Sequence, residues 1–456
     1  MKNLKRDSID FGRMNIPSLF CKMFFPTLIG LIFNALLTVA DGIFVGRGVG
    51  SDALAAVNIV APLFMLTTGM GLMFGIGASI VASVHLSRNN VKAACINMTQ
   101  AIGVALMIIV VLVAVAGYFH TQVLNLLGCS TRLMQPATAY LLLLLPGCIF
   151  LLLESIGMLL IRLDGSPRYA MMSNVVPALV NLLLDYLFIF PMNLGVGGAA
   201  LATSIGTATG GMMVLWYFVQ RSERLKFHRL KLSRTSMYLT MRNVGYMLKL
   251  GSAAFLGEVS MSVMMLTGNY VFMRLSGENG VAAYSVACYL FPIVFMMSNA
   301  VAQSAQPIIS YNHGAGDYLR VHTAQRTSII AGLACGMTAT FLISIFAGEL
   351  TALFLDPVCE AYSIAKDGLP WFAASALFFS LNIVFIGYYQ SIEKSSRATA
   401  FMLLRGIVLL VPAFLLLPVF AGNTGAWLAI PCAETATLIV IATDYLFHKQ
   451  RTIPEY

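Results

Sequence analysis

The chain has 456 residues, of which 59% are hydrophobic and only 10% are charged. Soluble domains usually carry about 25% charged residues, so a water-soluble fold has no means of burying this much apolar surface. The composition therefore excludes an ordinary soluble protein and indicates a protein embedded in a membrane.

Twelve apolar segments follow one another along the chain, separated by short polar or charged breaks. Each is long enough to cross about 30 Å of hydrocarbon, which takes about 20 helical residues. Only helices and closed barrels satisfy every backbone polar group in lipid, and segments this long and uniformly apolar exclude barrel strands. The sequence thus predicts an all-α integral membrane protein. The expected spans begin at Ile16, Leu54, Ala93, Pro136, Tyr169, Val196, Tyr246, Val281, Thr323, Tyr362, Ala398 and Thr424.

The net charge of +9 is distributed unevenly among the polar breaks. With the N-terminus inside, 23 of the 28 Lys and Arg residues lie on the inner side, four on the outer side and one within a span. This is the positive-inside pattern of membrane proteins, which nucleic-acid binding does not require. We therefore expect a bacterial inner-membrane protein with both termini in the cytoplasm and no nucleic-acid partner. The outer residues are Arg47, Arg132, Arg274 and Lys366, and the residue within a span is Arg405.

The sequence contains no pattern that predicts a cofactor. Its eight cysteines are scattered singly, without C-x-x-C spacing, so they indicate neither a disulfide framework nor a metal site. There is no Walker A loop, which argues against direct use of ATP. We therefore expect a transporter of small molecules rather than an enzyme.

The two halves of the chain repeat each other. Residues 54–90 align without gaps with residues 281–317 at a shift of 227 positions, and the same shift places Pro191 on Pro418. Each copy holds six spans, so both copies enter the membrane from the same side and are expected to be related by a pseudo-two-fold axis along the membrane normal. Transporters built in this way hold their substrate in a central cleft.

The repeat predicts two six-helix lobes joined by a basic cytoplasmic linker. We place the N-lobe at residues 1–219, the linker at 220–245 and the C-lobe at 246–456. The segment between the lobes is rich in Lys and Arg, as the positive-inside rule requires of a cytoplasmic loop. Specific binding of lipid or of a partner is the alternative interpretation.

Six ionisable residues lie deep within predicted spans. Placing a charged side chain at the centre of a membrane helix costs about 2.5–3.5 kcal/mol on insertion scales. Each such residue is therefore a candidate for a functional role. They are Asp41, Glu154, Asp185, Glu258, Arg405 and Glu434.

Four oxygen-bearing side chains of the first half fall at similar depths. Asp41, Asp185 and Thr203 each lie six residues from the outer end of their span, or about 9 Å deep. Asn181 is one turn deeper than Asp185 and on the same helix face. Such a group can form an all-oxygen site for a small cation such as sodium, or a carboxylate pair that shares a proton. Hydrogen bonds that only join the helices are the structural alternative.

The remaining candidates are deeper. Glu258, Arg405 and Glu434 lie eight or nine residues from a span end, about 12–14 Å deep, and Arg405 is expected to pair with one of the two glutamates. A buried ion pair of this kind is also compatible with a purely structural role. Glu154 lies about 12 Å from the inner surface, near Arg162.

Two parts of the sequence, one near each end, resemble motifs of the multidrug and toxic compound extrusion (MATE) transporters. Residues 26–29, 39–46 and 53–56 are similar to the first-helix signature of that family, and residues 425–431, followed by Glu434, to its closing motif. The resemblance extends over essentially the whole chain. It implies export of amphipathic, often cationic compounds in exchange for inward protons or sodium, with no cofactor.

Within that family the sequence is most similar to the DinF-type branch. The cation site of this branch uses an aspartate on helix 1, an asparagine and an aspartate on helix 5 and a threonine on helix 6. Asp41, Asn181, Asp185 and Thr203 match these positions one by one. The NorM-type branch instead uses an acid on helix 7, which Glu258 resembles, and an aspartate on helix 10. Residues 371–390 contain no acid, which argues against a complete second-half site.

The expected function is therefore a monomeric antiporter in contact with membrane lipid and with a small amphipathic substrate, and both protons and sodium remain open as the coupling ion. One alternative is a flippase for lipid-linked sugars, which would need more basic residues facing the cleft. Another is a membrane-embedded acyltransferase, which usually needs a histidine or metal cluster. The six histidines lie near span ends or in loops without metal spacing.

Overall fold

The computed structural model describes residues 9–230 and 233–452, without the side chains of residues 37–39, 42, 46–47, 51–52, 54 and 448–452. The two ends assigned to the cytoplasm, and the side chain of Arg47 assigned to the outside, lie outside the described residues. The described part consists of helices and short connections, without strands.

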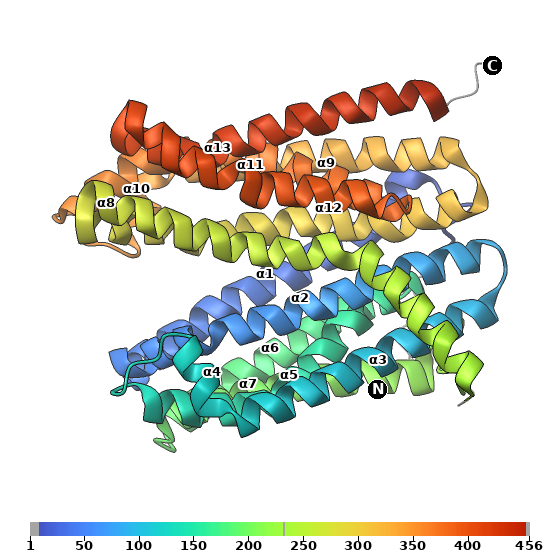
Figure 1. Ribbon diagram of the computed structural model, residues 1–456, viewed down its shortest axis with the longest axis horizontal. Coiled ribbons are helices and arrows are strands. Elements are labelled where there is room, and N and C mark those ends of the chain that lie inside the picture. The colour runs from blue at the N-terminus through green and yellow to red at the C-terminus, as the bar shows by residue number, and fades with distance from the viewer. Residues whose placement is uncertain (1–8, 231–232, 453–456) are drawn as a thin grey trace. The chain divides into compact units, whose positions relative to one another are not determined.

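The first half contains seven α-helices and ends in a π-helical turn (Figure 1). Helix α5 has many buried residues and packs against α2, α3, α6 and α7. The elements are α1 (Ile16–Gly48), α2 (Ser51–Ser87), α3 (Val91–Tyr118), α4 (His120–Leu126), α5 (Met134–Leu163), α6 (Pro167–Ile189), α7 (Gly195–Trp216) and η1 (Tyr217–Arg221).

The second half begins with the longest helix of the chain (Figure 1). Its elements are α8 (Arg234–Ala315), α9 (Tyr318–Ile345), α10 (Ala347–Ala352), α11 (Glu360–Ser391), α12 (Ser395–Leu403), the π-helical turn η2 (Leu404–Val408) and α13 (Leu410–Thr452).

Ten helical segments of the described residues are long and apolar enough to cross a membrane. Two of them contain a sharp break, at Ser276–Gly277 in α8 and at Gly422 in α13. The φ angles of Gly277 and Gly422 are 60° and 54°, a conformation that only glycine adopts at little cost. When each broken helix is divided at its glycine, the ten segments become the twelve predicted spans.

The segment between the two halves is shorter than the expected linker. Non-helical backbone ends at Ser233, whose side chain accepts a hydrogen bond from the Ser236 N–H at 3.2 Å and caps α8. Residues 234–245 are therefore helical. Before this cap, Asp164 at the end of α5 holds the linker, because its carboxylate accepts hydrogen bonds from the Ser222 hydroxyl at 3.0 Å and the Leu225 N–H at 3.0 Å.

The chain divides into two compact units. Unit 1 comprises Met1–Phe255 and Ser310–Val321, and unit 2 comprises Leu256–Ile309 and His322–Tyr456. Each unit has its own buried apolar interior. Unit 1 therefore includes the first part of α8, up to Phe255, and a second short piece made of the end of α8 and the start of α9.

Arg320 anchors the second piece, Ser310–Val321, within unit 1. Its guanidinium donates hydrogen bonds to the backbone carbonyls of Phe11 at 2.9 Å and Met14 at 2.8 Å, and to the side-chain oxygen of Asn312 at 2.9 Å. Asn312 also donates to the Phe11 carbonyl, at 3.2 Å. The segment that precedes α1 is thus fixed against the turn between α8 and α9.

Glycines let α2 and the first part of α8 cross at very short distance in unit 1. A Cβ atom added at Gly251 would lie 1.8 Å from the Met73 carbonyl oxygen, and one added at Gly77 would lie 2.1 Å from the Met247 carbonyl oxygen. Small residues at crossings are the usual way in which membrane helices gain close packing.

This crossing predicts a strong effect of a single methyl group. Gly251→Ala should lower the stability of the protein by about 3 kcal/mol, since the obstacle is backbone that cannot move aside. Gly245→Ala on the same helix is the matched control, because Gly245 is exposed with no atom near its missing Cβ. Thermal unfolding of the purified proteins in detergent checks the difference, and equal melting temperatures for the two variants would contradict it.

Candidate functional site

The four polar residues predicted for the first half lie together in unit 1. They come from α1, α6 and α7, and the packing of α7 against α6 depends on Gly206. A Cβ atom there would lie 2.9 Å from Asn181 Cβ and 3.0 Å from the Pro177 carbonyl oxygen. The glycine thus brings the face of α7 that carries Thr203 against the face of α6 that carries Asn181.

Direct contacts join this cluster. The Asn181 amide donates a hydrogen bond of 3.4 Å to the Thr203 hydroxyl, which itself donates to the Ala199 carbonyl at 3.0 Å. Asp185 lies beside Asn181 on one side and beside the carboxyl group of Asp41 on the other. The structure therefore brings together all four residues that the sequence selected.

The two carboxyl groups are short of hydrogen-bond donors. Asp185 is fully buried, and neither of its carboxylate oxygens accepts a hydrogen bond from the described residues. The same holds for one oxygen of Asp41. Two adjacent carboxylates repel each other strongly in a medium of low dielectric constant, so the pair needs a proton or a cation between its oxygens.

Tyr140 is a further member of the cluster that the sequence reasoning missed. This residue of α5 is buried, and its hydroxyl faces Asp41, Asp185 and Thr203. Tyrosines near span ends are common in membrane proteins, so the residue type by itself does not indicate a site. Its depth along the helix could have identified Tyr140. It lies six residues inside α5, and Asp41 and Asp185 were chosen because they also lie six residues from a span end.

The donor set consists of carboxylate, amide and hydroxyl oxygens. This is the chemistry of hard cations and protons rather than of transition metals. Among the described residues, no group of three or more His, Cys, Asp or Glu side chains has the arrangement of a metal centre.

Glu154 lies apart from this cluster. It is buried on α5, and its carboxyl group packs against Gly210 of α7. Arg162, expected nearby, is eight residues further along the same helix and does not pair with it. From the described part of the chain, Glu154 receives no hydrogen bond and no ion pair.

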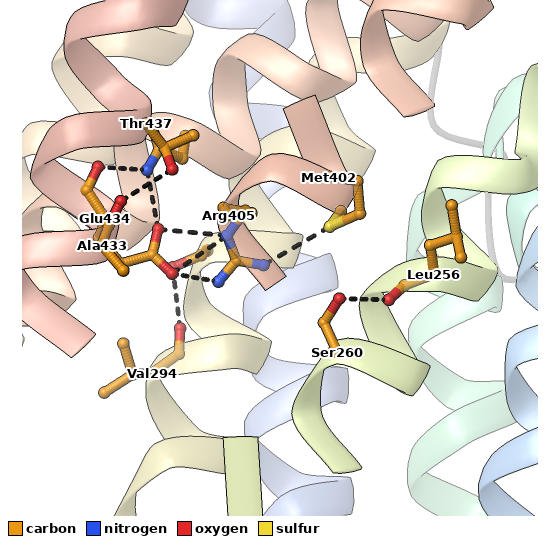
Figure 2. A network of polar contacts seen from close by, with 10 residues as sticks. Leu256, Ser260, Val294, Met402, Arg405, Ala433, Glu434 and Thr437 are labelled. Carbon is orange, nitrogen blue, oxygen red and sulfur yellow. Dashed lines mark hydrogen bonds and ion pairs between the residues drawn. The ribbon is translucent and has the colours of Figure 1, made fainter. Parts of the chain in front are cut away.

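In unit 2, Arg405 forms the expected ion pair, and its partner is Glu434 (Figure 2). Arg405 Nε donates to both carboxylate oxygens of Glu434 at 3.1 Å, and a terminal nitrogen donates to one of them as well. The guanidinium carbon also lies 4.3 Å from the centre of the Phe379 ring. Both side chains are almost completely buried.

The surrounding elements complete this pair. Asn382 of α11 donates to the Glu434 carboxylate at 2.7 Å and to its backbone carbonyl at 2.9 Å. Arg405 lies on the π-helical turn η2, where Gly406 is pressed against Ser260 of α8. Residues 371–390 contain no acid, but they contribute Asn382. This asparagine was not predicted, because only ionisable residues were considered in this half of the sequence.

Glu258 is not part of the network. It is buried on α8, and its side chain has no hydrogen bond or ion pair with the residues that the structure describes. The three second-half candidates therefore separate into a neutralised pair and a lone carboxyl group.

Comparison with known proteins identifies the family. A family model described as MatE matches residues 26–187 and 253–415, more than half of the chain and one segment in each repeat. A multidrug export protein, MepA of Staphylococcus saprophyticus, is 24% identical over 430 residues, which cover 94% of this chain and 93% of that protein. MepA of Staphylococcus aureus (strain MRSA252) is 25% identical over 433 residues, with the same coverage.

Solved structures agree in fold. A multidrug resistance MATE transporter of the MOP superfamily in an outward-facing conformation superposes with a TM-score of 0.89 at 21% identity, over 99% of this chain and 98% of that one. A MOP superfamily transporter from Pyrococcus furiosus gives a TM-score of 0.88 at 20% identity, over 97% of both chains. With twelve predicted spans and a family model that matches both halves, the chain belongs to the MatE family of multi-pass membrane transporters.

Proposed function

We propose that this protein is a secondary active antiporter that exports amphipathic, cationic drugs or other toxic compounds in exchange for protons or sodium ions moving inward. Family membership and the similarity to proteins named multidrug export protein support this proposal. The observation that carries the ion-coupling part is the pair of adjacent carboxyl groups of Asp41 and Asp185, buried without enough hydrogen-bond donors.

In this proposal Asp41 and Asp185 bind the coupling ion. Asn181 and Thr203 supply neutral oxygens beside the carboxylates, and Tyr140 closes the site from α5. A proton would be shared between the two carboxyl groups, whereas sodium would take oxygens from several of these side chains at once. Either ion removes the repulsion between the carboxylates, so ion binding and release change the packing of α1 against α6.

The energetics favour a site that handles more than one charge. A membrane potential of about 100 mV is worth about 2.3 kcal/mol per charge moved. Exchange of one cation for one monovalent drug moves no net charge, and a tenfold ion gradient alone is worth about 1.4 kcal/mol. Strong extrusion of a monocation would thus need two coupling ions, which a pair of carboxylates can accept.

We further propose that the transporter acts as a monomer in the bacterial inner membrane with both termini in the cytoplasm. The distribution of Lys and Arg residues supports the orientation.

For the second half, we propose that Arg405 and Glu434 stabilise unit 2. Glu258 is the alternative candidate for ion coupling. Since Glu434 neutralises Arg405, this cation is not available for the anionic phosphate of a lipid-linked sugar, which weighs against a flippase.

Removal of one carboxylate from the ion site should uncouple transport. In inside-out vesicles, Asp41→Asn or Asp185→Asn is expected to reduce gradient-driven uptake of a fluorescent cationic dye at least about tenfold, which corresponds to about 1.4 kcal/mol of lost coupling. The exposed Asp367 provides the matched control, Asp367→Asn, which should transport like the wild type. Proton and sodium gradients applied separately identify the ion. Full activity of both site variants would transfer the coupling role to Glu258.

The ion pair of unit 2 should behave as a structural element. Arg405→Met leaves the Glu434 carboxylate buried and unpaired, and should destabilise the protein by about 3–5 kcal/mol. The double variant Arg405→Met, Glu434→Leu removes both charges and should recover most of that loss. Thermal unfolding of purified protein together with dye uptake provides the measurement. A stable double variant without any transport would assign the pair to the transport mechanism instead.

A further inference from the structure

A buried carboxyl group that the proposed mechanism does not use lies between α5 and α7. Glu154 is only 8% exposed. A Cβ atom added at Gly210 would lie 2.4 Å from Glu154 Oε2, so the glycine is what leaves room for the carboxyl group. The carboxyl group thus occupies space that two closely packed helices make available to it.

No charged side chain that the structure describes on the surrounding helices compensates this carboxyl group. Between Gly195 and Trp216, α7 has no ionisable residue at all. Facing α5, helix α2 presents Gly71 and Gly75, which pack on Ser155 and on the backbone of Ile156. The helix interface around Glu154 is therefore formed by small and apolar groups.

The ionisable side chains of the neighbouring helices lie towards their two ends. Those near the Leu163 end of α5 are His85, Lys92, Cys95, Arg168, Tyr169 and, on α5 itself, Arg162. Those near the opposite end are Tyr118, His120, Asp185 and Tyr186 and, on α5, Tyr140. Cys148 lies in the middle of α5, six residues before Glu154. Among the described residues, none of these groups interacts electrostatically with Glu154.

The second repeat shows how the chain neutralises another deep glutamate. Glu434 is paired with Arg405, and the 227-residue shift that relates the repeats places Ala178 at the position of Arg405 and Thr207, not Glu154, at the position of Glu434. The first repeat therefore contains neither member of this ion pair at the corresponding positions. A carboxylate buried without a partner costs several kcal/mol or more, so Glu154 requires a bound ligand that removes its charge.

The ligand that fits is a proton. The described side chains include no cluster of acidic, His or Cys groups that could share a metal ion with Glu154. A proton needs no further ligands and no more space than the carboxyl group already occupies.

We propose that Glu154 is a second proton-binding site of unit 1, separate from the pair of Asp41 and Asp185. The carboxylate takes up one proton from water and becomes neutral, with no other bond made or broken. It keeps the proton while α5 and α7 are packed together as in this structure, and releases it when water reaches the space beside Gly210. The inference rests on the proposed antiport, to which it adds one proton per cycle.

Infrared spectroscopy of the purified full-length protein in lipid nanodiscs tests proton binding without reference to transport. A protonated carboxyl group in dry surroundings has a distinct C=O stretching band. At neutral pH the component of this band that arises from Glu154 should be present in the wild type and in Asp367→Asn, and should be missing from Glu154→Gln, while any component from Asp41, Asp185 or Glu258 stays. If the wild type and Glu154→Gln have identical spectra in this region from acidic to alkaline pH, Glu154 carries no proton and the proposal is overturned.

A second variant covers the case in which Glu154→Gln folds poorly. Gly210→Ala keeps the glutamate but places a methyl group where its carboxyl group lies, so the C=O band should shift or disappear. Gly245→Ala makes the same change at an exposed site and should leave the band as in the wild type. A band that is unaffected by Gly210→Ala comes from another carboxyl group, which would contradict the assignment.

The number of protons exchanged per substrate then separates this inference from the proposed function. In proteoliposomes, the membrane potential that stops net transport at a fixed pH difference reports this number. Glu154→Gln should still transport the cationic dye, but with one proton fewer per dye molecule. Wild-type protein without any gradient-driven transport would refute the antiport itself. Wild-type transport with an unchanged proton number in Glu154→Gln would refute only the role of Glu154.

Discussion

The structure depends on one constraint, which is that a carboxylate inside a membrane has to be neutralised by what lies next to it. Water is not present to solvate the charge, and an unpaired ion in such surroundings costs several kcal/mol or more. This chain meets the constraint in different ways. Glu434 is neutralised by Arg405 and bound by Asn382. Asp41 and Asp185 are placed side by side, an arrangement that is stable only with a proton or a cation bound.

Close helix packing makes these arrangements possible, and glycines produce it. Gly206 brings α7 against Asn181, Gly210 leaves room for Glu154, and Gly406 presses the turn that carries Arg405 against α8. Each of these glycines lies beside one of the buried polar groups. In a membrane, where the hydrophobic effect does not drive helices together, such contacts supply van der Waals packing and exclude lipid from the polar groups. The positions that set the packing are therefore also those that shape the surroundings of the buried polar groups.

The two repeats have used the same architecture for different purposes. In the first, the oxygen-bearing residues gather into a cluster without a fixed counter-ion. In the second, Arg405 supplies a permanent counter-ion, and the resulting pair has no open oxygen for a mobile cation. In our proposal, the duplicated six-helix unit allows one copy to exchange ions while the other provides a stable frame. Glu154 and Glu258 are both buried. In our proposal, Glu154 holds a further proton, and Glu258 is the remaining candidate.

The sequence by itself determined the helical membrane fold, the twelve spans and the residues of the first-half cluster, because apolar length, repeat register and depth along a helix are all one-dimensional quantities. Asp41, Asn181, Asp185 and Thr203 were found in this way. The inclusion of Tyr140, the choice of Glu434 over Glu258 as the partner of Arg405, and the isolation of Glu154 were decided only by the tertiary structure. These outcomes depend on which helix faces meet and how closely they approach. Depth places a residue at a level in the membrane, but helix rotation and packing select its neighbours.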